Sequence, residues 1–348
     1  MAENREGLTI NEIARLAGVS RSTVSRVLTG HPNVKPQTRK LVEEVIRKSN
    51  YRPNPIAQGL VKGSLKMIGL LVGDIRNSFY AELARGVEDV AHKAGYMVVF
   101  FNSDYDIDRE LFYLQGAQQF AFSGLILMSI LDGQELVPVL RNIKCPIVML
   151  NRYMRSFETD VVIVDNFQGA YLATKHLIEL GHTHIAHLSG PALSTASQER
   201  IAGFKQALQD HGIKCMERDI VEGDLLLESG RQFAERWIAQ SNRPTGIFVA
   251  NDFMALGVID VFLRKGVKIP DHVSIVGYDD LPYARVAPID LTTVRQPHYQ
   301  MGATAMEFLL QRIRGEAEFT QRITFMPELV VRSTTAPPPK DAMQGTTS

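Results

Sequence analysis

The sequence has little of what a secreted or membrane protein needs. Only two of its 348 residues are cysteines, Cys145 and Cys215, and nothing pairs them at the spacing of a disulfide, metal or redox site. No apolar run approaches the roughly 20 residues that span a bilayer. The first ten residues are polar and lack the apolar core of a signal peptide. We therefore expect a cytoplasmic protein without a membrane segment.

The sequence motifs of common enzymes are also missing. The chain contains no P-loop, no G-x-G-x-x-G after its first predicted strand, no H-E-x-x-H and no G-x-S-x-G. We expect no enzyme, no catalytic residue and no cofactor. A cluster of histidines, His182, His184 and His187, could suggest metal ligands, but it follows a glycine where a loop enters a strand. We therefore expect no metal site.

Charge is distributed unevenly along the chain, although the net charge is zero. Residues 1–63 contain 11 Lys and Arg against 5 Asp and Glu, which leaves 27 against 33 for the rest of the chain. A basic head suits a phosphate backbone, and an acidic body is repelled by the same polyanion. The charge pattern therefore favours a small DNA-binding head on a larger body.

Local signals in the head predict a helix, a tight turn and a second helix. Thr9 and Glu12 form a capping box, Gly18 suits a helix end, and Ser20 suits the cap of a helix that continues to about Leu28. A third helix is expected from about Pro36. The apolar positions of the first two helices would close a small core, at Ile10, Ile13, Ala14, Ala17, Val19, Val24 and Val27. The opposite face of the second helix is polar and basic, and suits phosphates and base edges.

Several motifs of this head resemble the LacI/GalR family of repressors. They are Thr9-Ile10, Ala14, Ala17-Gly18-Val19-Ser20, the run from Thr23 to Leu28, and Asn50-Tyr51-x-Pro53-Asn54. The resemblance implies that the second helix reads the major groove of double-stranded operator DNA, with Arg21, Ser22 and Arg26 as base readers. Residues that position this helix on the DNA backbone would include Ser20, Thr23 and Ser25.

Residues 53–60 resemble the hinge helix of the same family, which becomes helical when two copies meet on the operator. Pro55 suits a first helical turn, whereas Gly59 costs about 1 kcal/mol in a helix interior, so the helix would be marginal. The resemblance implies that Leu60 wedges into the minor groove, and Ala57 is expected among the DNA contacts. The alternative is a linker in which Leu60 only packs.

In the body, short β-rich runs alternate with amphipathic helical stretches. Strands are expected near residues 67–72, 97–101, 124–128 and 146–150, and again near 185–188, 246–249 and 273–277. This alternation is typical of α/β proteins with parallel sheets, here in two doubly wound lobes. Helices are expected near 79–94, 168–180, 199–211, 230–239, 252–264 and 298–314.

The predicted domain organisation has four parts. Residues 1–51 form the helix-turn-helix headpiece, 52–65 the hinge helix and linker, 66–335 the core, and 336–348 a disordered tail. Lobe one covers about 66–164 and 296–324, and lobe two about 165–293 and 327–335. The family resemblance extends from about Thr9 to Ser333 and implies a core of the type I periplasmic binding protein kind.

Open α/β sheets bind ligands at the carboxyl ends of their strands, and the residues there are polar or aromatic. Together with the family motifs, this position predicts a ligand site formed by Asn77, Phe79, Tyr80, Arg152, Arg200, Asn251, Asp279 and Gln296. The alternative for each residue is a cap, a turn or core packing, and Asp252 in particular suits a helix cap.

These side chains suit a sugar, because planar polar groups bond adjacent hydroxyls and an aromatic face covers the C–H side of the ring. The loop of residues 190–198 offers only hydroxyl and amide groups. Arg152, Arg155 and Arg200 favour an acidic sugar or a phosphate ester, whereas Asp279 favours hydroxyls. We expect a monosaccharide or a close derivative.

The function predicted from the sequence is a homodimeric transcriptional regulator, most simply a repressor, whose affinity for a palindromic operator is switched by a sugar-like effector. Two alternatives remain: a sugar-binding sensor or transport module, and a regulator that acts mainly through a protein partner. The basic head and the polar amino terminus argue against the transport module.

Overall fold

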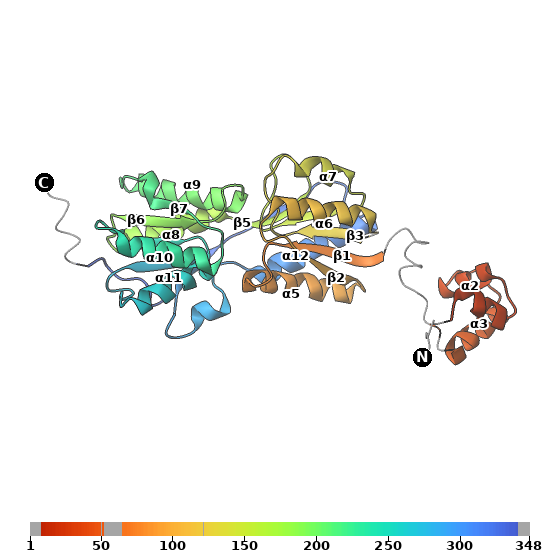
Figure 1. Ribbon diagram of the computed structural model, residues 1–348. Coiled ribbons are helices and arrows are strands. Elements are labelled where there is room, and N and C mark those ends of the chain that lie inside the picture. The colour runs from red at the N-terminus through yellow and green to blue at the C-terminus, as the bar shows by residue number, and fades with distance from the viewer. Residues whose placement is uncertain (1–7, 50, 52–64, 121, 340–348) are drawn as a thin grey trace. The chain divides into compact units, whose positions relative to one another are not determined.

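The structure is a computed structural model that describes residues 8–49, 51, 65–120 and 122–339. The chain forms two compact units, divided between Leu65 and Lys66. The first unit contains three helices, α1 (Ile10–Leu16), α2 (Arg21–Leu28) and α3 (Pro36–Ser49). The second contains two six-stranded sheets with covering helices (Figure 1). The predicted fold class, a helical headpiece and a two-lobed α/β core, is confirmed.

Local hydrogen bonds begin and end the headpiece helices as the sequence predicts. The Thr9 N–H donates to Glu12 Oε2 at 2.6 Å, and the Glu12 N–H donates to Thr9 Oγ1 at 3.4 Å. Gly18 has a φ of +63°, and the Ser20 hydroxyl accepts from the Thr23 N–H at 3.2 Å. The three helices bury a small core of Ile13, Ala14, Ala17, Val24, Val27 and Val42.

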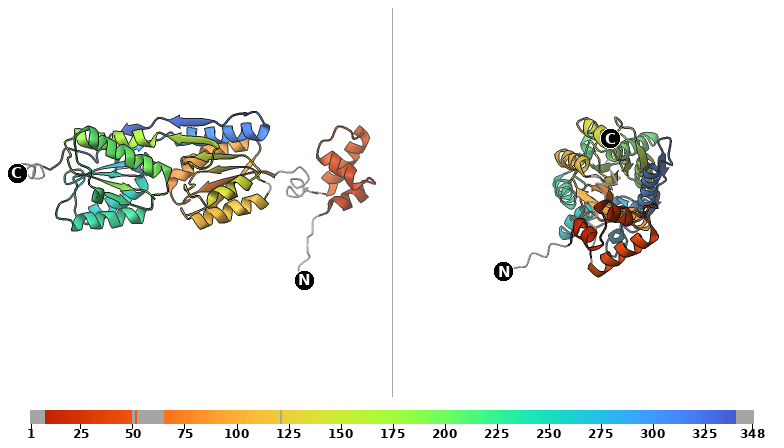
Figure 2. Two further views of the ribbon diagram at one scale, coloured as in Figure 1. Left: turned by 90° about the horizontal axis from the view of Figure 1, so that it is seen from above. Right: turned by 90° about the vertical axis from the view of Figure 1, so that its right-hand side faces the viewer.

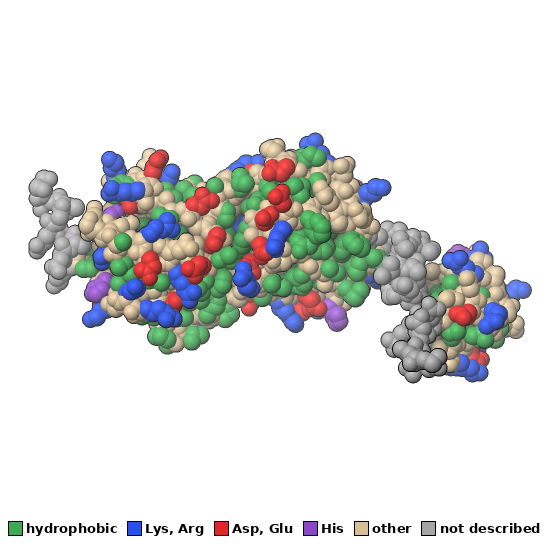
Figure 3. All heavy atoms as spheres, in the orientation of Figure 1, with side chains coloured by type: hydrophobic (Ala, Val, Ile, Leu, Met, Phe, Trp, Pro, Cys, Tyr) green, Lys and Arg blue, Asp and Glu red, His purple; other side chains and the backbone are tan. Residues whose placement is uncertain are grey.

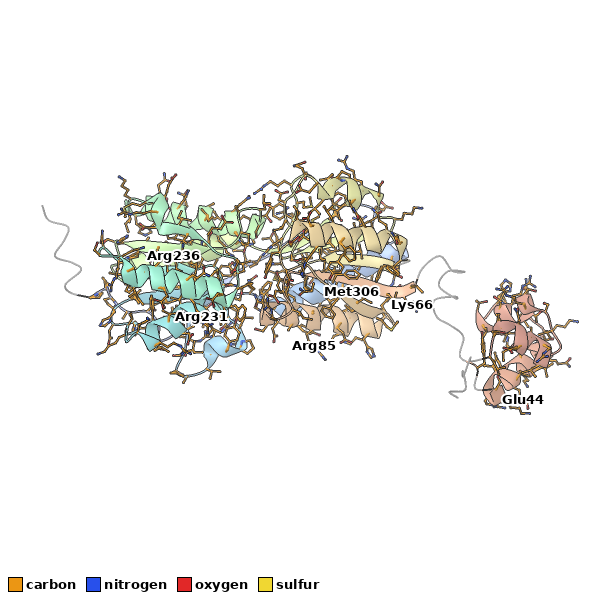
Figure 4. The ribbon with its side chains drawn as sticks, in the orientation of Figure 1. Glu44, Lys66, Arg85, Arg231, Arg236 and Met306 are labelled. Atoms are coloured by element: carbon orange, nitrogen blue, oxygen red, sulfur yellow. The ribbon has the colours of Figure 1, made fainter. Side chains whose placement is uncertain are left out.

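Lobe one is a sheet with helices on both faces. Its strand order is β11 (Arg322–Phe325), β5 (Asp160–Val164), β4 (Ile147–Leu150), β3 (Phe122–Leu127), β1 (Leu65–Val72) and β2 (Met97–Asn102). One face packs against α5 (Ser78–Lys93) and α12 (His298–Arg314), and the other against α6 (Ile107–Gln119) and α7 (Leu136–Asn142). Met306 of α12 is fully buried in the first of these cores (Figure 4).

Lobe two has the same architecture. Its strand order is β12 (Glu328–Val330), β10 (Thr292–Arg295), β9 (Ser274–Asp279), β8 (Gly246–Val249), β6 (Ile185–Ser189) and β7 (Ile220–Glu222). The β10–β12 pair is antiparallel, and β7, β6, β8, β9 and β10 pair in parallel. Helices α10 (Leu227–Ala239) and α11 (Asp252–Arg264) cover one face, and α8 (Asn166–Glu179) and α9 (Thr195–Asp210) the other. Two 3₁₀ turns, η1 (Glu217–Asp219) and η2 (Pro282–Arg285), complete the lobe.

The chain passes between the lobes three times. It leaves lobe one after β5, returns after β10 at residues 296–297, and leaves again between β11 and β12. Figure 2 shows the last two strands, in blue, along one side of the two lobes. These passages place the carboxyl ends of the parallel strands of both sheets at the junction of the lobes.

Glycines allow the covering helices to touch backbone to backbone. A Cβ on Gly302 of α12 would lie 2.0 Å from the Leu83 carbonyl oxygen of α5, and a Cβ on Gly86 of α5 would lie 2.2 Å from the Tyr299 carbonyl oxygen. The same close approach joins α10 and α11, where a Cβ on Gly230 would lie 2.0 Å from the Met254 carbonyl oxygen. Any larger residue at these positions must push the helices apart.

Some elements lie outside those predicted. Strands β5, β7 and β11 were missed. Neither β7 nor β11 has a continuous buried run, whereas β5, with sequence DVVIV, has one that could have been recognised. Helices α6 and α7 were also missed, and α9 begins at Thr195, one turn before its predicted start.

The tail was expected to be disordered from residue 336 onward, and this expectation is wrong for Ala336. Ala336 pairs with the Ser274 hydroxyl through both its N–H (3.0 Å) and its carbonyl oxygen (2.9 Å).

Candidate functional site

Helix α2 presents a polar face to solvent in the first unit. Val24 and Val27 point into the headpiece core, whereas Arg21, Ser22 and Arg26 are exposed. Thr23 and Ser25 are half-buried. The exposed side chains combine guanidinium and hydroxyl donors at the spacing of successive helical turns, which suits base edges and phosphates.

Ser20 has a structural task at the start of this helix. Besides capping α2, its hydroxyl lies 2.8 Å from the Ser22 hydroxyl and 2.9 Å from the Thr23 hydroxyl. It therefore orders the end of the helix that carries the exposed arginines. Ala57 and Leu60, the predicted hinge contacts, lie outside the described residues.

The second unit contains a cleft with about 340 Å³ of empty volume at the junction of the lobes, partly open to solvent. Its lining comes from both lobes and consists of Asn77, Phe79, Tyr80, Tyr105, Asn151, Arg152, Ser194, Ala196, Ser197, Arg200, Leu225, Asn251 and Asp279. All the predicted ligand residues except Gln296 are brought together here.

In lobe one, the first turn of α5 and the end of β4 supply the lining. Asn77 caps α5, since its Oδ1 accepts from the Phe79 N–H at 3.0 Å, and this cap holds Phe79 and Tyr80 in the cleft wall. Arg152 follows β4, is 2% exposed, donates through Nη1 to the Ser129 carbonyl oxygen at 3.2 Å, and lies over the Tyr105 ring. Its Nε has no partner among the described residues.

In lobe two, Arg200 of α9 is held by neutral groups. Its Nε donates to Asn166 Oδ1 at 2.9 Å, Nη1 donates to the Ala250 carbonyl oxygen, and the guanidinium stacks 3.7 Å from the centre of the Tyr278 ring. Asn251 also reaches the cleft, but both ends of its amide bond to backbone. It caps α11 by accepting from the Met254 N–H and donates to the Leu225 carbonyl oxygen. Asn251 therefore shapes the cleft wall while acting as a cap.

Asp279 ends β9 with a φ of +120° and is 3% exposed. Burial raises the pKa of its carboxyl group well above the usual value, although Arg200 opposes the shift. Gln296, predicted to face the ligand, is not among the described lining residues. It lies where the chain crosses from β10 to α12 and donates to Asp279 Oδ1 at 2.7 Å, so it supports Asp279 from behind.

The two acids next to these site residues are structural. Asp252, suggested as a cap, is fully buried, and its carboxylate accepts from the Thr293 hydroxyl at 2.6 Å and from the Leu281 N–H at 2.9 Å. Asp280 accepts from three arginines, which hold its pKa below the usual value despite burial. These are Arg285, Arg295 and Arg332.

The prediction missed several lining residues. Tyr105 follows β2 in a left-handed turn with a φ of +57°, and no local pattern marks it. Ser194, Ala196 and Ser197 belong to the loop whose hydroxyl groups the sequence did indicate, but which of them reach the cleft depends on where α9 begins. Leu225 lies in an irregular loop and comes close only through the fold.

The three histidines of the cluster His182, His184 and His187 have separate partners. His182 bonds to the Thr245 hydroxyl, His184 pairs with Asp219, and His187 bonds to the Phe248 carbonyl oxygen and stacks on the Phe248 ring. Within the described residues there is no cluster of three or more potential metal ligands, and no helix there is long and apolar enough to cross a membrane.

Glu110 of α6 is a fully buried carboxyl group behind the cleft. Its Oε2 accepts from the Leu131 N–H at 3.2 Å, and burial raises its pKa to about 7, against the opposing effects of that hydrogen bond and of Arg152. Folding therefore favours the protonated form. The stability that this provides is complete below the unfolded pKa of 4.5 and is lost as the pH rises through about 7.

We expect Glu110→Gln to remove this pH dependence. The variant should match the wild type near pH 5 and exceed its stability near pH 9 by up to about 3 kcal/mol, because the neutral amide is not penalised by burial. Urea unfolding at both pH values measures the difference. If the variant and the wild type differ in unfolding free energy by the same amount at both pH values, Glu110 does not titrate in this range.

Comparisons with known proteins agree with both units. The family model for bacterial regulatory proteins of the lacI family matches residues 9–54, and a periplasmic binding protein-like domain matches residues 174–335. Catabolite control protein A of Priestia megaterium is 38% identical over 310 residues, which cover 89% of this chain and 93% of the relative.

Two solved structures resemble the whole chain. A lac repressor dimer bound to operator and the anti-inducer ONPF has a TM-score of 0.81 and 30% identity, covering 95% of this chain and all of that one. A complex of the transcriptional regulator CelR with cellobiose has a TM-score of 0.70 and 30% identity, covering 94% and 99%. The relatives are transcriptional regulators and not enzymes, as expected.

Proposed function

Because the chain belongs to the LacI family of DNA-binding transcriptional regulators, we propose that it is a repressor that binds a palindromic operator as a homodimer. Its operator affinity is switched by a sugar or sugar derivative bound in the cleft of the core. As a regulator of bacterial DNA it acts in the cytoplasm. The observation that carries the proposal is the presence in one chain of an exposed arginine and serine face on α2 and a cleft lined by polar and aromatic side chains.

The lining supports a sugar-like effector. Phe79 and Tyr80 supply aromatic surface, and Asp279, Asn151 and Arg200 supply the planar polar groups that bond adjacent hydroxyls. The Asn151 Oδ1 is buried without a partner among the described atoms, which leaves it free to accept from a ligand. The CelR complex shows that a protein with this fold binds cellobiose.

An apolar edge of lobe one supports a dimer. Strand β2 ends its sheet, where Met97 and Phe100 are 62% and 44% exposed, and Phe112 and Phe120, in and just after α6, are 69% and 61% exposed. Figure 3 shows hydrophobic side chains gathered over this part of lobe one. An exposed apolar edge strand is a common place for a second copy to bind. Light scattering of the purified chain should give a dimer, and a tetramer would contradict the proposal.

The proposed function is tested by selecting bound sequences from a random duplex library, with the protein alone and with a pool of sugars and sugar acids. A palindrome enriched in either selection supports the regulator. Enrichment with the protein alone means that the effector releases the operator, and enrichment only with the sugar pool means that the effector promotes operator binding. No enrichment in both arms would favour a sensor that does not govern DNA through this headpiece.

We expect Arg26→Ala to relax base preference at one symmetric pair of operator positions. A bidentate contact between arginine and guanine is worth about 1–3 kcal/mol of discrimination. Repeating the selection with this variant measures the change. Arg15→Ala, which removes an exposed arginine from α1, is the matched control and should keep the wild-type consensus. A uniform loss of affinity with an unchanged consensus would make Arg26 a phosphate contact.

A further inference from the structure

The cleft contains more buried positive charge than negative charge. Arg152 and Arg200, at 2% and 6% exposure, both line it. Asp279 is the only carboxyl side chain among the described lining residues. Arg200 interacts electrostatically with Asp279, so the charge of Arg152 remains without an acidic counterpart in the lining.

Other partly buried arginines of the core are paired with carboxylates. Arg312 forms two hydrogen bonds with Asp160 at 2.7 and 2.8 Å, and Arg332 pairs with Asp280. No carboxylate of the described residues lies within ion-pairing distance of Arg152. Burying an unpaired charge is costly, so the two cleft arginines depart from the pattern of the rest of the core.

The immediate surroundings of Arg152 do not neutralise it. Its contacts are the Ser129 carbonyl oxygen and the Tyr105 ring at 5.2 Å, and its Nε is buried without a partner among the described residues. Glu110 interacts with it electrostatically from behind the cleft, yet that carboxyl group is itself held toward its neutral form by burial. An N–H donor on a charged group therefore remains without a partner among the described residues, in a cleft lined by both lobes.

Three helices also begin at the cleft. The lining includes the caps of α5 (Asn77), α9 (Ser194) and α11 (Asn251), together with first-turn residues such as Ser197. Helix amino termini carry partial positive charge and backbone N–H donors. Their convergence adds to the field of the two arginines.

We propose that the effector carries an anionic group, a carboxylate or a phosphate, and that Arg152 binds this group from lobe one while Asp279 and Arg200 bind hydroxyls from lobe two. The inference rests on the proposed function, since it names the chemical class of that effector. It narrows the class from sugars in general to sugar acids or sugar phosphates. The free Nε and the terminal nitrogens of Arg152 match the oxygens of either group.

The test uses thermal unfolding of the full chain in inorganic phosphate, in acetate and in sodium chloride of matched ionic strength. An anion at ten times its Kd raises the folded-to-unfolded ratio about elevenfold. The wild type should gain this stability in phosphate, acetate or both, and Arg152→Gln should not. In chloride alone, Arg152→Gln should be at least as stable as the wild type, because the buried charge has been removed.

Arg155→Gln is the matched control, because Arg155 lies three residues away, is half exposed and already pairs with Asp132 at 3.0 Å. This control should respond to the anions like the wild type. Arg152→Lys, which keeps the charge, should retain part of the response and serves if Arg152→Gln does not fold. A response to phosphate alone indicates a phosphate ester, and a response to acetate alone a sugar acid.

Equal responses of the wild type and Arg152→Gln, including no response in either, would overturn the anionic effector. Operator selection separates this result from failure of the proposed function. If an operator is selected and the Arg152 response is absent, only the anionic class is wrong. If the Arg152 response is present and no operator is selected, the anion site stands and the regulator proposal fails.

Discussion

Replacing Asp279 by alanine is expected to abolish the response of operator affinity to the effector. Asp279 is the only carboxyl group among the described lining residues, and Gln296 holds it in place at 2.7 Å. Burial favours the neutral form of this carboxyl group, and hydrogen bonds between neutral groups contribute about 0.5–1.5 kcal/mol each, so the loss of two bonds to the effector lowers effector affinity by about 5- to 150-fold. Operator affinity measured with and without the selected sugar pool checks this result.

DNA binding in one effector state should survive the substitution, because the headpiece folds on its own capping bonds and core. Asp279→Asn is the companion variant. Its amide oxygen still accepts from Gln296, so it should fold like the wild type and lose less affinity than Asp279→Ala. If the alanine variant loses its circular dichroism signal, Asp279 is needed for folding. If it keeps the full effector response, the cleft assignment fails.

The second large effect is on stability, and it follows from the contact of α5 with α12. Gly302→Ala is expected to destabilise the core by about 2 kcal/mol or more, since the added Cβ would lie 2.0 Å from the Leu83 carbonyl oxygen. A backbone atom cannot move aside as a side chain can. The helices must therefore separate and loosen the core that contains Met306 and Leu309.

Gly116→Ala in α6 is the matched control for this prediction. Nothing lies within 4 Å of its added Cβ, so the substitution should stabilise the protein by about 0.5–1 kcal/mol through helix propensity. Urea unfolding of the two variants should therefore give changes of opposite sign. A stabilised Gly302→Ala variant would mean that α5 and α12 are not held in backbone contact.

The headpiece could be predicted closely because its information is local. Thr9, Glu12, Gly18 and Ser20 each act within a few residues of their own position, through a cap or a left-handed turn. The exposed face of α2 follows from the spacing of Val24 and Val27 along one helix. The ligand residues could be predicted in part, since parallel strands place the residues that follow them at a common edge.

The sequence by itself determined the two-unit organisation, the capped helices and the strand ends that converge on the cleft, because these depend on short-range periodicity and on caps. Only the tertiary structure decided which polar atoms near the cleft are already bonded. It turned Gln296 into a support for Asp279, committed the Asn251 amide to backbone, placed Tyr105 under Arg152 and left the Arg152 Nε free. These outcomes depend on partners 17 to 47 residues away along the chain, and no local pattern encodes the distance between them.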